Sequence, residues 1–409
     1  MISKTYSESF KTKAAFLITN LLNEPLIAFY AMLPFILRKE LNATAFQLSL
    51  FIMIRPIVSG LSFYFGVYLS KKSEPNLLKN SVATYIIARI PFLFLPFLNN
   101  FYYIFFSSVI YQLFYKANLP AWTEILKRNI KDENSRFDLF STFSIFVFIE
   151  SILIGILIGS FLDKSTENWK ILFFISSFIS ISTIFFQLKL KVASPKKIEK
   201  NISGNFFSNI SKILKNDKNF TSFQIGFSIG GFALMLITPA LYLFLNDILK
   251  ITHQEMIFAR LVIMGIGFSL TSILWKKSLI KKSINSLMYY VLFGFSLYIL
   301  LLAFSKYSII FFYGAFLIYG ISQAGSTLIF NLSGMIFSKD DNSILYTSTN
   351  LLFLGIRGLI APLFGSLLCK YIDPATVLFI GLIILLYGIY IAYKSSKKPN
   401  ILSVKEETL

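Results

Sequence analysis

The chain has 409 residues, of which 55% are hydrophobic and only 14% are charged, and its formal net charge is +19. About a quarter of the residues of a water-soluble domain are charged, so this composition excludes an ordinary soluble enzyme or binding module. The basic residues lie mostly between long apolar runs, where they mark membrane topology, and we expect no nucleic-acid partner.

Long apolar segments recur along the whole chain. A helix needs about 20 mostly apolar residues to cross a bilayer core about 30 Å thick. These runs lack the alternation with a period of two that a membrane β-barrel requires. The sequence therefore predicts an all-α membrane protein with twelve transmembrane helices in two pseudo-symmetric six-helix bundles. The predicted spans are 14–37, 46–70, 77–98, 101–123, 139–162, 169–189, 219–246, 254–275, 284–304, 307–337, 344–369 and 374–394.

The distribution of Lys and Arg between alternate loops predicts the orientation. Most of the 39 basic residues fall on the side that holds both termini and the central segment, which places that side in the cytoplasm. The polar, Lys-rich segment 189–218 cannot cross lipid, and we interpret it as a linker between an N-terminal bundle (1–188) and a C-terminal bundle (219–409). Within it, residues 206–214 form an amphipathic stretch suited to an anionic membrane surface.

The two halves show an internal repeat. At an offset of 205 residues, Arg55 aligns with Arg260, and Gly60 aligns with Gly265. The pair Lys71-Lys72 then aligns with Lys276-Lys277. Equivalent positions are six spans apart, so the repeats run parallel in the membrane.

In this arrangement the chain resembles the major facilitator superfamily over nearly its whole length. The loop motif Gly-x-x-x-Asp-Arg/Lys of that family is degraded, because Gly66 and Lys71 are present but Ser70 occupies the acidic position. The resemblance implies a secondary transporter that works by alternating access, with spans one, four, seven and ten lining a central cavity. It also implies a multi-pass membrane protein that binds a small-molecule substrate, and we expect it to act as a monomer. The abundance of Lys, Asn, Ile and Phe indicates an AT-rich genome and therefore the cytoplasmic membrane of a bacterium.

Seven ionisable side chains fall inside predicted spans, where a charge is costly unless it is paired or functional. Five are basic and two are acidic, which favours an anionic solute such as an organic acid or a phosphorylated metabolite. Arginine forks suit planar or tetrahedral oxyanions, and Arg55 with Arg260 resembles the arginine pair of the nitrate/nitrite porters. The seven residues are Glu24, Arg55, Arg89, Lys116, Glu150, Arg260 and Arg357.

Uncharged polar residues extend this set. Asn20 in span one, and Gln323 and Asn331 on one face of span ten, are candidates to line the cavity, although small polar residues also serve simple helix packing. The predicted substrate-binding residues are thus Arg55, Arg260, Arg357, Lys116, Asn20, Gln323 and Asn331.

Glu24 and Glu150 are the side-chain candidates for a coupling proton. A structural alternative pairs Glu150 with Arg260, and Glu24 with Arg55 or Arg357, in ion pairs. For Arg89, we expect packing against a neighbouring helix of its own half.

Three other functions stay open: a proton-coupled exporter of amphipathic compounds, a lipid flippase of the same fold, and a membrane receptor or scaffold without transport. Because Cys369 and His253 are the only Cys and His, and no P-loop is present, we expect no metal, no cofactor and no enzymatic activity.

Overall fold

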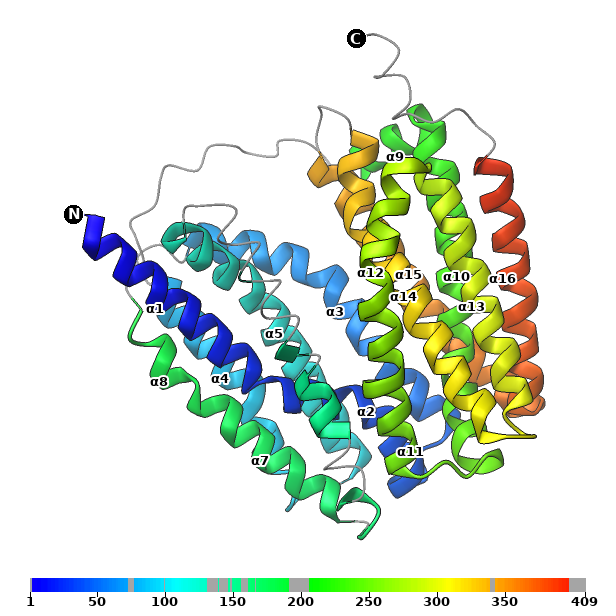
Figure 1. The fold of residues 1–409 in the computed structure, drawn as a ribbon, viewed down its shortest axis with the longest axis horizontal. Coiled ribbons are helices and arrows are strands. Elements are labelled where there is room, and N and C mark those ends of the chain that lie inside the picture. Colours follow the sequence, from blue (N-terminus) through cyan, green and yellow to red (C-terminus); the bar gives the residue numbers. More distant parts are fainter. Residues whose placement is uncertain are drawn as a thin grey trace. The chain divides into compact units, whose positions relative to one another are not determined.

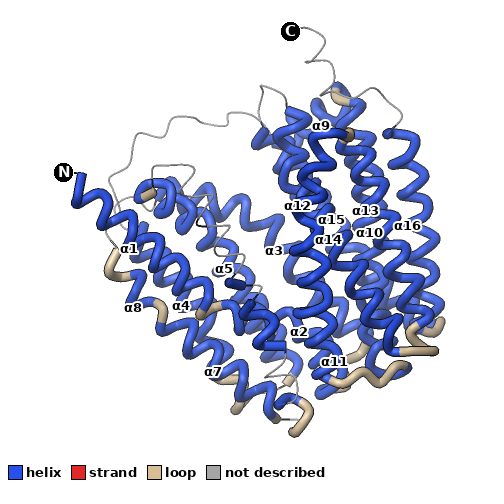
Figure 2. The backbone as a smooth tube through the Cα atoms, viewed as in Figure 1, coloured by secondary structure: helices blue, strands red, loops and turns tan. Residues whose placement is uncertain are grey.

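The computed structural model describes most of the chain, and every regular element in the described part is a helix (Figure 2). The described residues are 2–72, 77–98, 100–130, 139, 146–147, 149–155, 161–165, 167–190, 206–338 and 343–396.

The chain forms two compact units. The N-terminal unit comprises Met1–Ala43, Ile57–Asn201 and Thr252–Ile257, and the C-terminal unit comprises Thr44–Pro56, Ile202–Ile251 and Phe258–Leu409. Two short segments thus belong to a different unit from the residues on either side of them in the sequence. They are Thr44–Pro56, in the C-terminal unit, and Thr252–Ile257, in the N-terminal unit. The bundle limits at 188 and 219 stay a prediction.

The helices of the N-terminal unit begin with a broken span. The predicted first span, 14–37, lies within the apolar segment Phe10–Leu41, which is long enough to cross a membrane, but its helix is interrupted, because α1 ends at Leu21 and α2 begins at Glu24. Pro25, at the start of α2, has no N–H and disfavours helical backbone at the residue before it, which explains why the helix restarts there. The helices of this unit are α1 (Ile2–Leu21), α2 (Glu24–Leu41), α3 (Ala45–Lys72) after Pro56, α4 (Leu77–Leu93), α5 (Phe101–Asn129), α7 (Asn168–Ser182), α8 (Ile184–Gln187) and α11 (His253–Ile257).

The C-terminal unit is a bundle of long helices that run side by side (Figure 1). α10 packs on α15 and α16, α13 packs on α14 and α16, and α12 packs on α14. Its elements are the first part of α3, α9 (Phe206–Asn216), α10 (Lys218–Leu243), η1 (Phe244–Ile248), η2 (Phe258–Ile263), α12 (Met264–Lys281), α13 (Ile284–Phe304), α14 (Ile309–Ser338), α15 (Ser343–Tyr371) and α16 (Pro374–Ser396).

Two short π-helices, η1 and η2, interrupt the regular helices of this unit. The sequence did not predict either of them. A π-helical turn inserts an extra residue into the helix and is frequent at functional sites. Arg260 lies on η2, inside the predicted eighth span.

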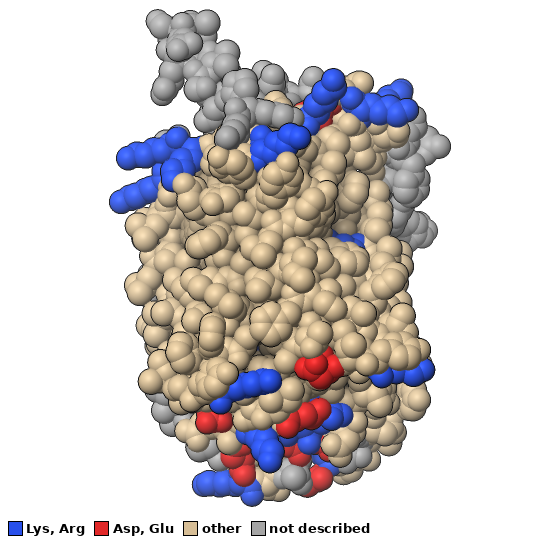
Figure 3. All heavy atoms as spheres, turned by 90° about the vertical axis from the view of Figure 1, so that its right-hand side faces the viewer, with Lys and Arg blue, Asp and Glu red and all other residues tan. Residues whose placement is uncertain are grey.

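Eight described helical segments are long and apolar enough to cross a membrane. Large apolar side chains are exposed along them, for example Leu270 on α12 at 70% and Ile383 on α16 at 66%. On the face drawn in Figure 3, charged residues gather at the two ends and the wide band between them is almost free of charge, as a lipid-facing surface requires. Half of the predicted fifth span lies outside the described residues, and the other predicted spans coincide with helices.

The predicted linker contains the helix α9 at the position of the amphipathic stretch. Ile210 on α9 is buried, and the helix contacts α10 and α15 of its own unit. Lys212 and Lys215 on the same helix are exposed. The apolar side of this stretch therefore packs at least partly on protein.

Candidate functional site

An arginine surrounded by tyrosines lies within the C-terminal unit. Arg260 on η2 has as electrostatic neighbours Tyr242 on α10, Tyr298 on α13 and Tyr319 on α14. The Tyr242 hydroxyl accepts a hydrogen bond from the guanidinium. Tyr242 and Tyr298 are 4% and 3% exposed, so these two tyrosines are buried. We call these four residues the arginine–tyrosine cluster.

The rings of the cluster pack on one another and on neighbouring phenylalanines. The ring centroids of Tyr298 and Tyr319 lie 4.9 Å apart. Tyr319 lies 5.5 Å from Phe295, and Tyr298 lies 6.2 Å from Phe316. Aromatic pairs with such geometry contribute about 0.5–1.5 kcal/mol each beyond the area that they bury. This packing holds the tyrosine hydroxyls in place around the guanidinium.

Two glycines allow the helices beside the cluster to approach closely. A Cβ atom on Gly320 of α14 would lie 2.1 Å from the carbonyl oxygen of Met264 on α12. A Cβ atom on Gly267 of α12 would lie 2.5 Å from the carbonyl oxygen of Leu317. Membrane helices commonly use small residues for such contacts. This contact sets the spacing between η2, which continues into α12, and the tyrosine on α14.

Arg55 approaches the same tyrosine from α3. It interacts electrostatically with Tyr319, and its side chain is exposed. The next residue, Pro56, packs on α15, where a Cβ atom on Gly358 would lie 2.2 Å from the Pro56 Cβ. Arg55 and Arg260, which the repeat predicts at similar depth, thus have Tyr319 as a common neighbour.

Arg357 is a third arginine of the C-terminal unit and is buried. One of its terminal nitrogens donates a hydrogen bond of 2.8 Å to the carbonyl oxygen of Phe227 on α10, and its guanidinium lies 5.0 Å from the Phe227 ring centroid. Its Nε is buried and has no hydrogen-bond partner. The guanidinium fits because a Cβ atom on Gly231 would lie 2.5 Å from its central carbon.

The described acidic residues of the C-terminal unit all lie at helix ends. Asp217 caps α10, Asp247 lies on η1 near the end of a span, and Asp373 precedes α16. In the described part of this unit, no carboxylate forms an ion pair with Arg260 or Arg357. The interior of this unit is therefore cationic.

Two predicted amides lie on α14 beyond the cluster. Gln323 follows Tyr319 by one helical turn, and its Nε2 donates to the Thr327 hydroxyl at 3.4 Å. Asn331 lies about two turns beyond Gln323 and is exposed. Steps of four residues keep these side chains on one face of the helix. The face thus extends the arginine–tyrosine cluster with polar groups.

The two predicted acids, Glu24 and Glu150, are half-buried and lie together in the N-terminal unit. Glu150 interacts electrostatically with Glu24, and one oxygen of Glu150 is buried without a hydrogen-bond partner. Glu24 is the first residue of α2, directly after the break in the first span. Ion pairs of these acids with the arginines would join residues of different units, and they stay a prediction.

Arg89 forms a set of hydrogen bonds that the sequence analysis did not identify. Its side chain is fully buried at 0% exposure. Its Nε and one terminal nitrogen donate to the Asn23 side-chain oxygen, at 3.1 and 2.7 Å. Nε also donates to the Ser180 hydroxyl at 2.7 Å. The other terminal nitrogen donates to the Tyr85 carbonyl oxygen at 2.8 Å. The Tyr85 ring centroid lies 3.3 Å from the guanidinium. Arg89 therefore joins α4 and α7 to the break between α1 and α2 through uncharged acceptors.

The remaining predicted residues of the N-terminal unit are less distinctive. Asn20 is half-buried and donates to the carbonyl oxygen of Phe16, within its own helix. Lys116 on α5 is half-buried. In the described part of the chain, no group of three or more His, Cys, Asp and Glu side chains has the arrangement of a metal site.

These features define a class of protein: a multi-pass helical membrane protein with ionisable residues inside its bundles. A family model for the Major Facilitator Superfamily matches residues 22–338, and the chain belongs to that superfamily. The predicted membership and fold class are confirmed, and the multi-pass membrane location follows from both.

Solved structures with the same fold are transporters. A point mutant of the nucleoside transporter NupG aligns with a TM-score of 0.75 at 16% identity, covering 94% of this chain and 100% of that chain. A bacterial homologue of the human lysosomal transporter Spinster, inward-facing and unoccupied, gives 0.65 at 14%, with 95% and 97% covered. A POT family transporter in complex with 5-aminolevulinic acid gives 0.71 at 12%, with 94% and 96% covered. No curated protein sequence matches the chain.

Proposed function

We propose that the chain is a secondary transporter that moves a small anionic solute, such as an organic acid or a phosphorylated metabolite, by alternating access. The observation that carries this proposal is the position of Arg55 and Arg260 around Tyr319 in a unit whose described acids lie at helix ends. The fold suits organic solutes, because solved structures that share it include a nucleoside transporter and a complex with 5-aminolevulinic acid.

The chemistry of the cluster favours an oxyanion. A guanidinium has five N–H donors in a planar fork, and it binds carboxylate or phosphate oxygens through two parallel hydrogen bonds. Tyr242 accepts a side-chain hydrogen bond from Arg260, and the three tyrosine hydroxyls can also donate to an anion. A buried arginine without an acid costs several kcal/mol, and an anionic solute offsets that cost when it binds.

Solute uptake into proteoliposomes tests the proposal. A panel of radiolabelled organic acids, phosphorylated metabolites and neutral analogues is compared between the parent, Arg55→Gln and Arg260→Gln. Loss of a charge-assisted hydrogen bond of about 1.5–3 kcal/mol raises KM for the anion about 10- to 150-fold. Lys276→Gln, an exposed residue at the end of α12, is the charge-matched control and leaves KM unchanged. Anion uptake that is equal in the parent and in both arginine variants refutes the proposal.

Coupling to protons is a further part of the proposal, supported by the neighbouring carboxyls Glu24 and Glu150. Two neighbouring carboxylates repel each other when both are ionised, so the binding of a proton to one of them is a candidate coupling step. A transmembrane pH gradient then drives uptake by the parent, whereas Glu150→Gln retains counterflow exchange and loses the response to the gradient. Equal responses of the two proteins remove the pair from the coupling mechanism.

Orientation completes the proposal: both termini lie in the cytoplasm of a bacterial cell, and the protein acts as a monomer. Exposed lysines at one end of the C-terminal unit, on α9, α12 and α16, support this by the positive-inside rule. An exporter of amphipathic compounds or a lipid flippase would be indifferent to the arginine variants. A receptor or scaffold would show no solute flux at all.

A further inference from the structure

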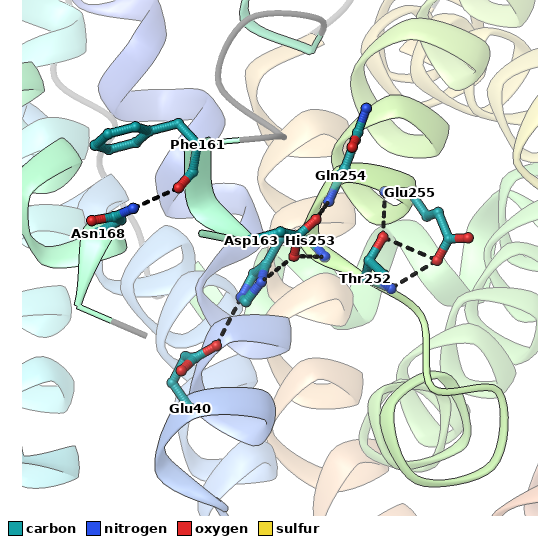
Figure 4. A network of polar contacts seen from close by, with 8 residues as sticks. All are labelled: Glu40, Phe161, Asp163, Asn168, Thr252, His253, Gln254 and Glu255. Atoms are coloured by element: carbon teal, nitrogen blue, oxygen red, sulfur yellow. Dashed lines mark hydrogen bonds and ion pairs between the residues drawn. The ribbon is translucent and has the colours of Figure 1, made fainter. Parts of the chain in front are cut away.

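The single histidine of the chain lies between two carboxylates. His253 Nδ1 is 3.0 Å from an oxygen of Asp163, and Nε2 is 3.1 Å from an oxygen of Glu40 (Figure 4). The side chains of His253 and Glu40 are only 4% and 8% exposed. All three residues belong to the N-terminal unit, although 252–257 follows α10 and η1 of the other unit in sequence.

Asp163 also binds the backbone of the same segment. Its two oxygens accept hydrogen bonds from the amides of His253 and Gln254, each at 2.9 Å. Burial opposes ionisation of this carboxyl, but the hydrogen bonds from these amides and from the imidazole outweigh burial and lower the pKa of Asp163 below its usual value. Asp163 therefore stays ionised throughout the range in which histidine titrates.

The other charged groups around this site are Lys39 and Glu255. Lys39 on α2 interacts electrostatically with Asp163, Glu40 and Glu255. Glu255 accepts hydrogen bonds from the amide and hydroxyl of Thr252, one turn back. On the remaining side, the edge of the imidazole contacts the Phe35 ring at a centroid distance of 5.7 Å. Two carboxylates, Glu40 and Asp163, thus contact the imidazole, and Lys39 is a charged neighbour of both.

The geometry has a direct consequence for the proton. A neutral imidazole has one N–H and one lone pair, so it donates to only one of two carboxylates on its opposite nitrogens. The other carboxylate then faces a lone pair, which is repulsive. An imidazolium carries a proton on each nitrogen and is attracted to both carboxylates, to Asp163 by a hydrogen bond and to Glu40 by an ion-pair contact that lacks hydrogen-bond geometry. The attraction of the ring to the two carboxylates therefore differs between the neutral and the protonated form.

We propose that His253 is a proton-binding site, separate from the arginine–tyrosine cluster. It closes a clasp between segment 252–257 and the rest of the N-terminal unit. The clasp consists of Glu40, Asp163, His253 and the Gln254 amide. In acid the imidazolium bridges both carboxylates and the clasp is closed. When the ring loses this proton, the attraction to one carboxylate is lost and the clasp loosens.

The position of the clasp explains what it controls. α11 begins at His253 and continues directly through η2 into α12. Arg260 follows His253 by about two helical turns on this continuous helical segment. A closed clasp therefore fixes the end of the helical segment that carries Arg260. The proton on His253 thus regulates how freely that end moves, whatever solute the protein transports.

Hydrogen exchange of the full-length protein in lipid nanodiscs tests the clasp without any solute. Exchange of the peptide that covers 252–257 is measured at about pH 5.5 and about pH 8, and each rate is corrected for the intrinsic pH dependence of amide exchange. The expected result is protection about tenfold higher at the lower pH, because an added hydrogen bond to a charged group holds the segment. Amides in the middle of α13, which carries no acidic or basic side chain, are the internal control and show equal protection.

Two variants separate the proton from the contact. In His253→Gln, which cannot titrate, the pH difference disappears. Glu40→Gln keeps His253 and leaves only Asp163 in contact with it, so the difference in protection between the two pH values shrinks. Equal protection of the parent at both pH values refutes the proposal, and so does an undiminished pH difference in either variant. Since the readout is local exchange, failure of the anion-transport proposal leaves this result intact.

Discussion

Replacement of Gly320 by Ala is the sharpest test of how the arginine–tyrosine cluster is positioned. The added Cβ would lie 2.1 Å from the Met264 carbonyl oxygen and 2.9 Å from its carbonyl carbon, whereas ordinary contacts begin at 3.4 Å. Both obstacles are backbone atoms, so α12 and α14 must move apart by about 1 Å. Forced overpacking of this kind costs about 1–3 kcal/mol. Alanine recovers up to about 1 kcal/mol of helix propensity relative to glycine, so a net loss is expected.

Two measurements detect this shift. Thermal unfolding in detergent is followed by a fluorescent dye that reacts with the thiol of Cys369, which is half-buried in the folded protein, and it reports the loss of stability as a lowered midpoint. Solute uptake reports the loss of geometry, because a helix displacement of this size next to Tyr319 changes its distance from Arg260. We expect KM to rise at least about tenfold, since misplacement by about 1 Å is enough for losses of that order.

Gly314→Ala is the matched control on the same helix. A Cβ atom there would meet only a Leu301 methyl carbon at 4.0 Å, which is ordinary contact. This variant should therefore be as stable as the parent or slightly more stable, because alanine has the higher helix propensity. Equal melting midpoints and equal KM values for the two variants would refute the argument that backbone contact between α12 and α14 sets the site.

Two further predictions concern polar contacts. Asn23→Ala removes the acceptor of two Arg89 hydrogen bonds and should lower the free energy of unfolding by about 2–3 kcal/mol in a denaturant titration. Asn20→Ala, which removes one hydrogen bond within its own helix, should lower it by less. Equal losses in the two variants would contradict the role of Arg89. Hydrogen bonds from the Thr376 hydroxyl and amide and from the Ala375 amide lower the pKa of Asp373, against a smaller effect of burial. The contribution of Asp373 to stability is thus fully present above the usual Asp pKa of about 3.9 and is lost as the pH falls through the lowered pKa. The melting midpoints of the parent and Asp373→Ala should therefore converge in acid. A difference in midpoint that stays constant with pH would contradict this.

The membrane class of the chain was readable from sequence because it depends on local composition. Apolar runs of about 20 residues predict spanning helices wherever they occur, and the described helices coincide with those runs. Helix breaks are harder to place. The break at Asn23 needed only Pro25 to be recognised, whereas the π-helix at Arg260 has no comparable sequence signal, because it depends on packing against α14.

Ionisable residues inside spans were also found from sequence alone, since a charge in an apolar run is conspicuous and costly. Their partners were not. Arg89 was expected to be a packing residue, and its acceptors Asn23 and Ser180 come from distant spans. His253 was considered only as a metal ligand, and its partners were missed because Glu40 and Asp163 lie far from it in the chain.

The sequence by itself determined that this protein is a helical membrane protein with cationic residues inside its bundles, because hydropathy and charge act residue by residue. Only the tertiary structure decided which side chains meet. It brought Tyr242, Tyr298 and Tyr319 around Arg260 in the C-terminal unit. It placed Glu24 and Glu150 together in the N-terminal unit. Such contacts join helices through packing at long sequence separation, and no local pattern records them.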